Sequence, residues 1–161
     1  MIDIALNLGC GNKQFENLEE CKCINVDKRK LKGINVIADV EYLPFKESCT
    51  DYILASDIIE HFPIDKTKAI LWGWNRSLKI GGILELRCPN LRAICKKYID
   101  RVHNTKLTSW LLYGGQDYAL NFHYVGFDKE WLSSLLEECK FQIISYKEAD
   151  NNMILKARKI K

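Results

Sequence analysis

The sequence lacks any apolar run long enough to span a membrane. No stretch approaches the ~20 consecutive apolar residues that a bilayer-spanning helix requires. The first residues, MIDIALNLG, carry Asp3 and lack the basic cluster that opens a signal peptide. We therefore expect a cytoplasmic protein without a membrane partner.

Cysteine pairs at metal-binding spacing are also absent. The chain has seven cysteines, an odd number, and no C-x-x-C pair occurs among them. Cys21 and Cys23 are too close together for a zinc knuckle. We interpret the seven residues as reduced, mostly buried thiols, and we predict no metal site.

Repeats, low-complexity segments and linkers are missing too, which favours a single structural unit. A length of 161 residues suits one domain, and we place its bounds at 1–161. The hydrophobic fraction of 47% and the charged fraction of 28% are ordinary for a globular protein. The net charge of +3 is small, and we interpret the two basic clusters, 28–32 and 156–161, as solvated faces.

What the chain does contain is a series of short apolar runs. Runs without polar alternation indicate strands that are buried on both faces, as in a parallel sheet. These runs cover residues 4–8, 23–26, 34–38, 51–56 and 82–88. Near the end of the chain, two further strand-like runs at 141–149 and 152–159 are joined by a turn signal and predict an antiparallel hairpin.

Helical patterns lie between these runs. We expect helices that begin at the N-caps Asp65, Asn90 and Asp128, each followed by apolar residues at helical spacing. Residues 103–127 show no clean periodicity and are rich in aromatics, which is typical of a functional loop or lid. Strands that alternate with helices predict an α/β fold with a doubly wound sheet.

Polar residues and glycines follow the ends of the predicted strands, where such sheets bind their ligands. The first run ends at Gly9-Cys10-Gly11, and the polar residues after it could begin a helix. Glycine accepts positive φ and lets a ligand approach the backbone closely. An acidic residue about sixteen positions later, Asp27, can hydrogen-bond both ribose hydroxyls of an adenosine.

The third glycine of a dinucleotide fingerprint is missing. The pattern G-x-G-x-x-G requires it for close packing between helix and strand, but Gln14 stands at that position. An NAD-dependent oxidoreductase is therefore disfavoured. The alternative without a ligand is that the glycines only make a tight turn, and that Asp27 and Asp39 only cap helices.

Four segments resemble the class I S-adenosylmethionine-dependent methyltransferases, of the type 11 group. They are LNLGCGN, INVDKRK, IADVEYLPFKESCTDYILASDIIEHF and LKIGGILELRCPNL. The resemblance implies a Rossmann-like, mostly parallel seven-stranded sheet that ends in the antiparallel hairpin. It also implies S-adenosylmethionine as the cofactor and S-adenosylhomocysteine as the product.

The resemblance assigns cofactor roles to seven positions. Three would line the methionine moiety, one the ribose, two the adenine, and one would lie near the sulfonium. In that order they are Gly9, Cys10 and Gly11; Asp27; Asp39 and Val40; and Ser56.

Two histidines are the candidates for a general base. His61 follows the fourth run in a Glu-His pair that is often structural in the family, and His123 lies in the aromatic segment. A histidine near its reference pKa of ~6.5 can accept a proton at neutral pH. We keep both as catalytic candidates beside the alternative that they only shape the site.

The methyl acceptor is left open by these patterns. We expect a small-molecule or sugar-type substrate, recognised through residues 103–127, a neighbouring subunit or a large substrate that covers the site. An RNA or protein methyltransferase is the alternative, although the N-P-P-type motif of amino-methylating nucleic-acid enzymes is replaced here by ASDI. A non-catalytic cofactor-binding module is a third possibility, and the protein is expected to be a monomer or a homodimer.

Overall fold

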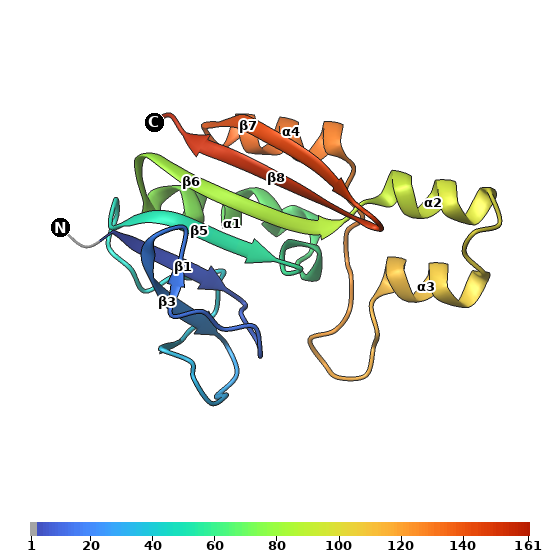
Figure 1. Ribbon diagram of the computed structural model, residues 1–161, viewed down its shortest axis with the longest axis horizontal. Helices are drawn as coiled ribbons and strands as arrows, with labels where there is room; N and C mark the ends of the chain where they lie inside the picture. The colour runs from blue at the N-terminus through green and yellow to red at the C-terminus, as the bar shows by residue number, and fades with distance from the viewer. Residues whose placement is uncertain (1–2) are drawn as a thin grey trace.

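The computed structural model describes residues 3–161, which form one mixed sheet with helices beside it (Figure 1). The strands are β1 (Ile4–Leu8), β2 (Asn17–Leu18), β3 (Cys21–Asp27), β4 (Val36–Ile37), β5 (Thr50–Ser56), β6 (Leu78–Pro89), β7 (Phe141–Ala149) and β8 (Asn152–Lys159). The sheet order is β2-β3-β1-β5-β6-β8-β7, and the two-residue β4 also pairs with β3.

The central strands run parallel and the two ends of the sheet are antiparallel. β1 lies between β3 and β5, and both pairings are parallel, as is that of β5 with β6. β8 pairs antiparallel with β6 and β7, and the turn between β7 and β8 falls at Asp150 and Asn151. The predicted α/β fold class is therefore confirmed, including the C-terminal hairpin, and the sheet has eight strands where seven were expected because the short β2 joins its edge.

The helices are η1 (Ile59–His61), α1 (Ile64–Ser77), α2 (Leu91–Ile99), α3 (Thr105–Tyr113) and α4 (Lys129–Glu138). Figure 1 shows α1 and α4 behind the sheet, whereas α2 and α3 extend beyond the end of β6. The large buried cluster joins α1 and α4 to the sheet through Leu71, Trp74 and Leu136. Burial of these side chains, at ~25 cal/mol per Å² of apolar surface, is the main force that holds this layer in place.

The opposite face of the sheet carries no helix within residues 3–161 (Figure 1). Its buried cluster is small and consists of Ala5, Cys21 and Tyr52. No helix begins after Gly11, in contrast to the expectation, and turns with positive φ at Gly9 and Gly11 lead into β2 instead. The edge strand β2 takes the place of that helix.

Two of the three predicted helix starts are confirmed and one is wrong. The side chains of Asn90 and Asp128 accept hydrogen bonds from the third residue of their helices. Asp65 instead lies inside the first turn of α1, because the rigid Pro63 stands at the N-cap. The expected loop at 103–127 is irregular only in its second half, since Asn104 caps α3 through the Leu107 N–H.

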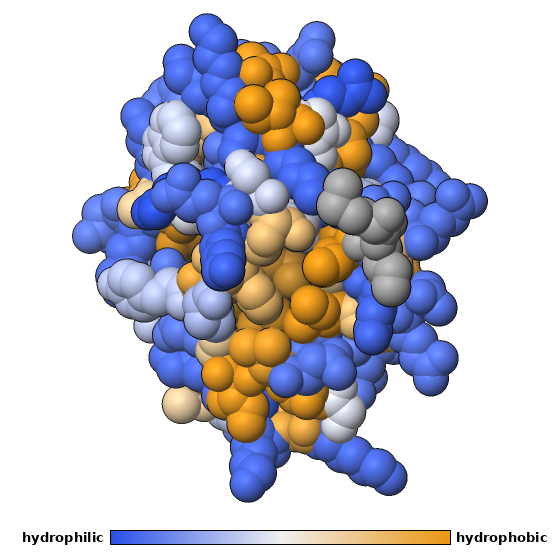
Figure 2. All heavy atoms as spheres, turned by 90° about the vertical axis from the view of Figure 1, so that its left-hand side faces the viewer, coloured by the Kyte–Doolittle hydropathy of each residue, from blue (hydrophilic) through white to orange (hydrophobic). Residues whose placement is uncertain are grey.

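The end of the sheet at which β1, β5 and β6 begin presents a mixed surface. Figure 2 shows apolar side chains in a central stripe with hydrophilic ones on both sides. Among residues 3–161, no helix is both apolar and long enough to cross a bilayer.

A buried lysine ties β8 to the end of α1 and yields a stability prediction. Lys159 Nζ donates to the carbonyls of Asn75 and Leu78, at 2.8 Å each, where α1 leaves carbonyls without helical partners. We expect Lys159→Met to lower the free energy of unfolding by about 1–3 kcal/mol, because both carbonyls lose a charged donor. Urea unfolding measures this loss. Lys147→Met, on an exposed position of β7, is the control and should change stability little; an equal loss in both variants would contradict the capping role.

Candidate functional site

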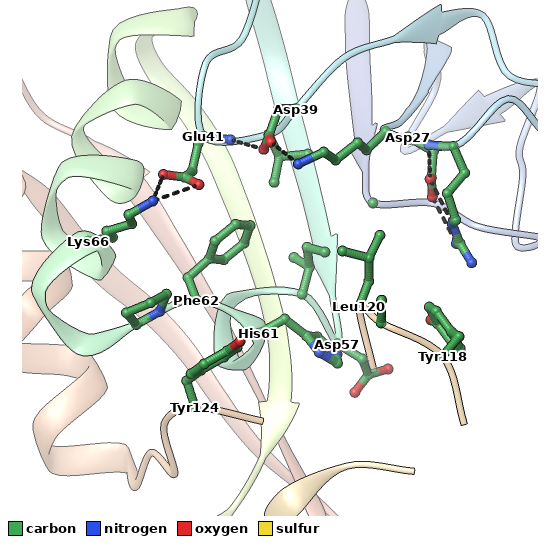
Figure 3. A pocket seen from close by; sticks show the side chains of 17 residues that line it. Asp27, Asp39, Glu41, Asp57, His61, Phe62, Lys66, Tyr118, Leu120 and Tyr124 are labelled. Carbon is green, nitrogen blue, oxygen red and sulfur yellow. Dashed lines mark hydrogen bonds and ion pairs between the residues drawn. The ribbon is translucent and has the colours of Figure 1, made fainter. Parts of the chain in front are cut away.

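A cavity of about 360 Å³ opens where β1, β3 and β5 end (Figure 3). This volume lies in the range of small-molecule sites. Five residues from the predicted set stand in its wall: Gly9, Asp27, Asp39, Val40 and His61. The other predicted residues do not line the cavity, but each stands one or two positions from a lining residue in the sequence; they are Cys10, Gly11, Ser56 and His123.

The turn after β1 brings backbone to the cavity. Gly9 and Gly11 have φ of 60° and 52°, a left-handed conformation that favours glycine. Cys10 between them is buried, and burial followed by the charge of Asp27 raises the pKa of its thiol to about 11. The thiol therefore stays protonated at neutral pH, and the turn offers the cavity its backbone rather than a thiolate.

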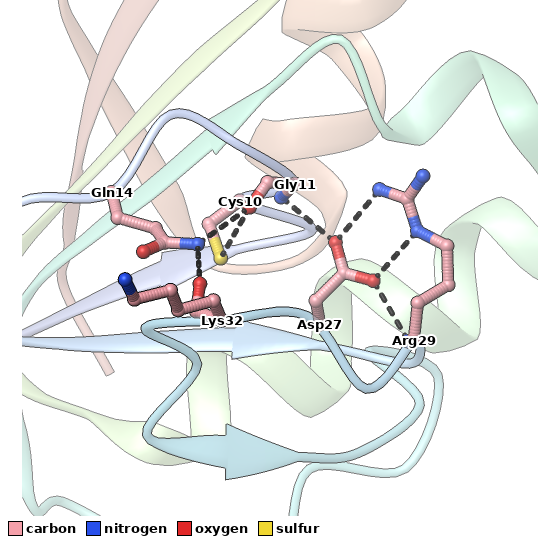
Figure 4. A network of polar contacts seen from close by, with 6 residues as sticks. All are labelled: Cys10, Gly11, Gln14, Asp27, Arg29 and Lys32. Atoms are coloured by element: carbon pink, nitrogen blue, oxygen red, sulfur yellow. Dashed lines mark hydrogen bonds and ion pairs between the residues drawn. The ribbon is translucent and has the colours of Figure 1, made fainter.

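Gln14 holds this turn in place of a third glycine (Figure 4). Its amide nitrogen donates to the carbonyl of Gly11 at 3.0 Å and to that of Lys32 at 2.7 Å. The loop after β1 is thereby tied to the loop after β3. A long polar side chain at this position builds the turn by hydrogen bonds, where a dinucleotide fold relies on close packing against a helix.

Asp27 closes β3 and carries a full set of hydrogen bonds (Figure 4). One oxygen accepts from Gly11 N–H at 2.8 Å and from the Arg29 guanidinium at 3.1 Å; the other accepts from Arg29 Nε and backbone N–H. Burial acts to raise the pKa of Asp27, but the hydrogen bonds from Arg29 and Gly11 outweigh it and hold the pKa below its usual value. The carboxylate is therefore ionised at neutral pH.

The second acidic residue stands on the loop after β4. Asp39 accepts from Lys28 Nζ at 2.7 Å and from the Glu41 N–H at 3.1 Å. Burial opposes these bonds, but the net effect lowers the pKa of Asp39. The neighbouring Val40 is buried, and its carbonyl accepts the Trp74 indole N–H at 2.9 Å, so α1 fixes this wall.

Asp57 lines the cavity one residue beyond Ser56, although the sequence analysis assigned it no role. Asp57 has a φ of 54° without being glycine, an uncommon conformation that clusters at functional sites. Its carboxylate pairs with Arg87 and accepts from Asn152 at 2.7 Å and from the Ser56 hydroxyl at 3.1 Å. Ser56 thus acts on the cavity through Asp57. A polar residue just past a strand end was the available signal.

His61 and His123 lie together, edge to face, with ring centroids 4.9 Å apart. Nδ1 of His61 lies 2.9 Å from the Phe122 carbonyl, and Nδ1 of His123 lies 3.1 Å from that of Leu111. Burial, followed by the neighbouring His123, lowers the pKa of His61; burial also lowers the pKa of His123. Both imidazoles are therefore neutral at pH 7, with Nδ1–H donating to a carbonyl.

A third titratable group, Glu60, lies against these histidines. It is 1% exposed, and burial raises its pKa to about 8. Its backbone carbonyl accepts the Tyr124 N–H at 2.8 Å, which holds the irregular part of 103–127, here called the aromatic loop, against η1. Glu60, His61 and His123 each place one potential ligand atom within 4.8 Å of the others. The expectation that the chain has no metal site rested on the spacing of its cysteines, and this cluster contains no cysteine.

The irregular half of 103–127 supplies one wall of the cavity. Tyr118, Leu120 and Tyr124 line it on the side opposite Asp27 and Asp39 (Figure 3). The Arg29 guanidinium lies over the Tyr118 ring, 5.4 Å from its centroid. The segment is thus attached to the same arginine that holds Asp27, a link that no sequence pattern predicted.

A family model described as a methyltransferase domain matches residues 6–86, which is half of the chain. The match runs from within β1 to within β6 and includes every cavity residue contributed by the strand ends. No curated protein matches this sequence.

Solved structures support the fold over its whole length. A crystal structure of an S-adenosylmethionine-dependent methyltransferase from Methanosarcina mazei is 21% identical, with a TM-score of 0.71, and the alignment covers 99% of this chain and 93% of that one. The 1,6-didemethyltoxoflavin-N1-methyltransferase of Burkholderia thailandensis, solved with its substrate and S-adenosylhomocysteine, is 15% identical, with a TM-score of 0.69 and coverage of 99% and 72%.

A third solved structure with a similar fold is named for a different reaction. The [4+2]-cyclase SpnF is 14% identical, with a TM-score of 0.68 and coverage of 99% and 75%. Because the same fold hosts different reactions, the function has to be inferred from the residues that line the cavity. The family match and the sheet order together show that this chain belongs to the class I S-adenosylmethionine-dependent methyltransferases.

Proposed function

We propose that the chain transfers a methyl group from S-adenosylmethionine to an oxygen of a small-molecule or sugar-type acceptor. The observation that carries this proposal is the convergence of Gly9, Asp27 and Asp39 on one cavity at the carboxyl ends of the strands. Ligands of open α/β sheets bind at this place. These three residues are among those to which the family resemblance assigns cofactor contacts.

The residues present suit the cofactor. The turn at Gly9 brings backbone to the cavity wall, Asp27 offers an ionised carboxylate for a ribose diol, and Val40 offers an apolar surface for adenine. Asp39 is placed to accept from the exocyclic amine of the base. When bound, S-adenosylmethionine supplies the methyl group as a sulfonium electrophile, and the protein mainly binds and orients.

The walls on the acceptor side favour a flat or sugar-like substrate. Tyr118, Leu120 and Tyr124 are 45%, 46% and 64% exposed, although they line the cavity. Exposed aromatic rings at a cavity mouth bind rings and sugar faces by stacking and by their polar tips. His61, neutral in the same wall, can accept the proton of an acceptor hydroxyl, an effect worth typically ~10²–10⁴-fold.

The Arg29 side chain competes with the cofactor in this proposal. Asp27 already accepts four hydrogen bonds, three of them from Arg29, and an ionised carboxylate offers about four acceptor positions. A ribose diol must therefore displace the guanidinium, which is 39% exposed. We expect Arg29→Gln to bind S-adenosylmethionine about three- to fivefold more tightly, because a partly exposed ion pair is worth up to ~1 kcal/mol.

Calorimetry measures this gain. Arg92→Gln is the matched control, since Arg92 pairs with Asp128 and Glu130 on α4 and is not a cavity residue. Weaker binding in Arg29→Gln, with Arg92→Gln unchanged, would show that Arg29 supports the cofactor instead of competing with it.

Product formation tests the proposal itself. The purified protein is incubated with S-adenosylmethionine and a panel of hydroxylated aromatics and sugars, and S-adenosylhomocysteine is quantified. We expect release that depends on one class of acceptor and is lost in Asp27→Asn. Release driven by RNA instead, and suppressed by salt, would favour the macromolecular alternative. Cofactor binding without turnover on any acceptor would favour a binding module.

A further inference from the structure

We propose that Glu60, His61 and His123 bind a divalent transition-metal ion of the zinc class at the edge of the cavity. Two imidazoles and one carboxylate place their ligand atoms within 4.8 Å of one another. Three protein ligands of this kind, with a further position left for water or substrate, are the donor set of catalytic zinc sites. The inference concerns metal binding and does not depend on the proposed function.

The carboxylate of Glu60 is the first independent sign of a cation. Both of its oxygens are buried, and neither has a hydrogen-bond partner among the residues that the structure describes. A buried polar group without a hydrogen-bond partner costs free energy, and buried carboxylates are found paired or bound to metals. Neither oxygen of Glu60 accepts a hydrogen bond from a lysine or arginine of the described chain, so a bound cation would satisfy these oxygens and favour the ionised form.

The orientation of the two imidazoles is the second sign. Each ring donates Nδ1–H to a backbone carbonyl, of Phe122 for His61 and of Leu111 for His123. A neutral imidazole held in this way presents a lone pair on Nε2. Metal-bound histidines almost always donate their other nitrogen in the same manner, which fixes the ring and its tautomer.

The present spacing is wider than a loaded site requires. Ligand bonds of ~2.0–2.2 Å in a tetrahedral site bring donor atoms to about 3.4 Å from one another, so donor atoms that now lie within 4.8 Å would approach by up to about 1.4 Å. Rotation of the Glu60 side chain and small shifts of the edge-to-face imidazoles can supply this movement. Both backbone ties between η1 and the aromatic loop, Glu60 carbonyl to Tyr124 and Val125 N–H, would remain.

The position of the ion would define the acceptor class. His61 stands in the cavity wall between Tyr124 and Asp57 (Figure 3), so an open coordination position would face the acceptor. This role rests on the proposed methyl transfer, and a bound ion would replace His61 as the general base, because Nε2 of His61 would then be a ligand. The ion would lower the pKa of an acceptor hydroxyl bound to it, and the proton would pass to water. The acceptor oxygen would bond to the methyl carbon while the carbon–sulfur bond breaks and its electron pair goes to sulfur.

Cobalt(II) is the probe for this site. The full chain is freed of metal by a chelator and titrated with Co²⁺, without S-adenosylmethionine. We expect one equivalent to bind with visible ligand-field absorption and without a thiolate-to-cobalt charge-transfer band. Glu60→Gln and His123→Gln should each weaken binding at least tenfold, and Zn²⁺ should displace the cobalt. His103→Gln, which removes the histidine outside the cluster, is the matched control and should bind as the wild type does.

Several results would overturn the inference. One is the absence of Co²⁺ and Zn²⁺ binding to the wild type at protein concentrations well above micromolar. Another is a charge-transfer band, which would place the ion on cysteines. A third is undiminished binding in both cluster variants, whose folding is checked by thermal unfolding. Because S-adenosylmethionine binding is measured separately, a chain that binds cobalt but not the cofactor would support this site and contradict the proposed function.

Discussion

Asp27→Asn is expected to weaken S-adenosylmethionine binding about 100-fold. The substitution keeps the shape of the side chain but removes its charge and one acceptor oxygen. Hydrogen bonds to a charged group are worth about 1.5–3 kcal/mol each, and ~2.8 kcal/mol corresponds to 100-fold in affinity. Calorimetric titration of both proteins with S-adenosylmethionine and S-adenosylhomocysteine measures the ratio.

The fold of the variant must be separated from its binding defect. Asp27 also accepts the Gly11 N–H, so the turn after β1 loses part of its support in the variant. Asp51→Asn is the matched control, because Asp51 is likewise ion-paired, to Lys79, but stands near the start of β5 and away from the cavity. Equal affinity of wild type and Asp27→Asn would contradict the ribose contact. Equal losses in both variants would point to stability instead.

Gly9→Ala is expected to lose both stability and cofactor binding. Gly9 has a φ of 60°, which costs an L-residue about 1–2 kcal/mol, and an added Cβ would lie 2.6 Å from Cδ1 of Ile58. Relief of that overlap moves Ile58, itself a cavity residue, from its place. We expect a loss of about 2–4 kcal/mol in the free energy of unfolding and at least tenfold weaker cofactor binding, since overpacking adds about 1–3 kcal/mol.

Substitution of a second glycine by alanine is expected to raise the free energy of unfolding instead of lowering it. Gly73 lies inside α1, and a Cβ there would meet nothing closer than the Glu41 carbonyl at 4.0 Å. Gly73→Ala should therefore stabilise the protein by about 0.5–1 kcal/mol, through the lower entropy of its unfolded chain. Urea unfolding of the pair tests the assignment. Two stabilising substitutions, or two equal losses, would contradict the special geometry of Gly9.

The strand-end rule explains how much of the site could be predicted. Gly9, Asp27 and Asp39 each follow an apolar run, and parallel strands carry their carboxyl ends to the same edge. These residues needed only local patterns to be found. Their roles in cofactor binding remain predictions. These roles require the three residues to line the same cavity, and they do.

The segment 103–127 was predicted as a functional loop, but the side chains that it brings to the cavity depend on tertiary contacts. Tyr118, Leu120 and Tyr124 belong to a segment without periodicity, and the Glu60 carbonyl holds its end in place. Glu60 and His123 are 63 positions apart in the sequence and meet only because of that contact. Patterns within one window of sequence carry no information about such pairs.

The secondary-structure errors have local causes. The strand β2 ends in a turn at Glu19 and Glu20 with φ of 48° and 64°, and glutamate gives no signal for a left-handed turn. The helix α3 packs chiefly against α2 and leaves Trp110 and Tyr113 exposed, so its apolar residues do not form the single stripe that predicts a helix.

The most direct test of the proposed cofactor site is calorimetric titration of the wild-type chain with S-adenosylmethionine, with NAD as the negative control. We expect one cofactor to bind per chain with micromolar affinity, about −8 kcal/mol, and we expect no heat of binding for NAD. Absence of S-adenosylmethionine binding by the folded protein would contradict the assignment of the cavity at Gly9, Asp27 and Asp39 as the cofactor site.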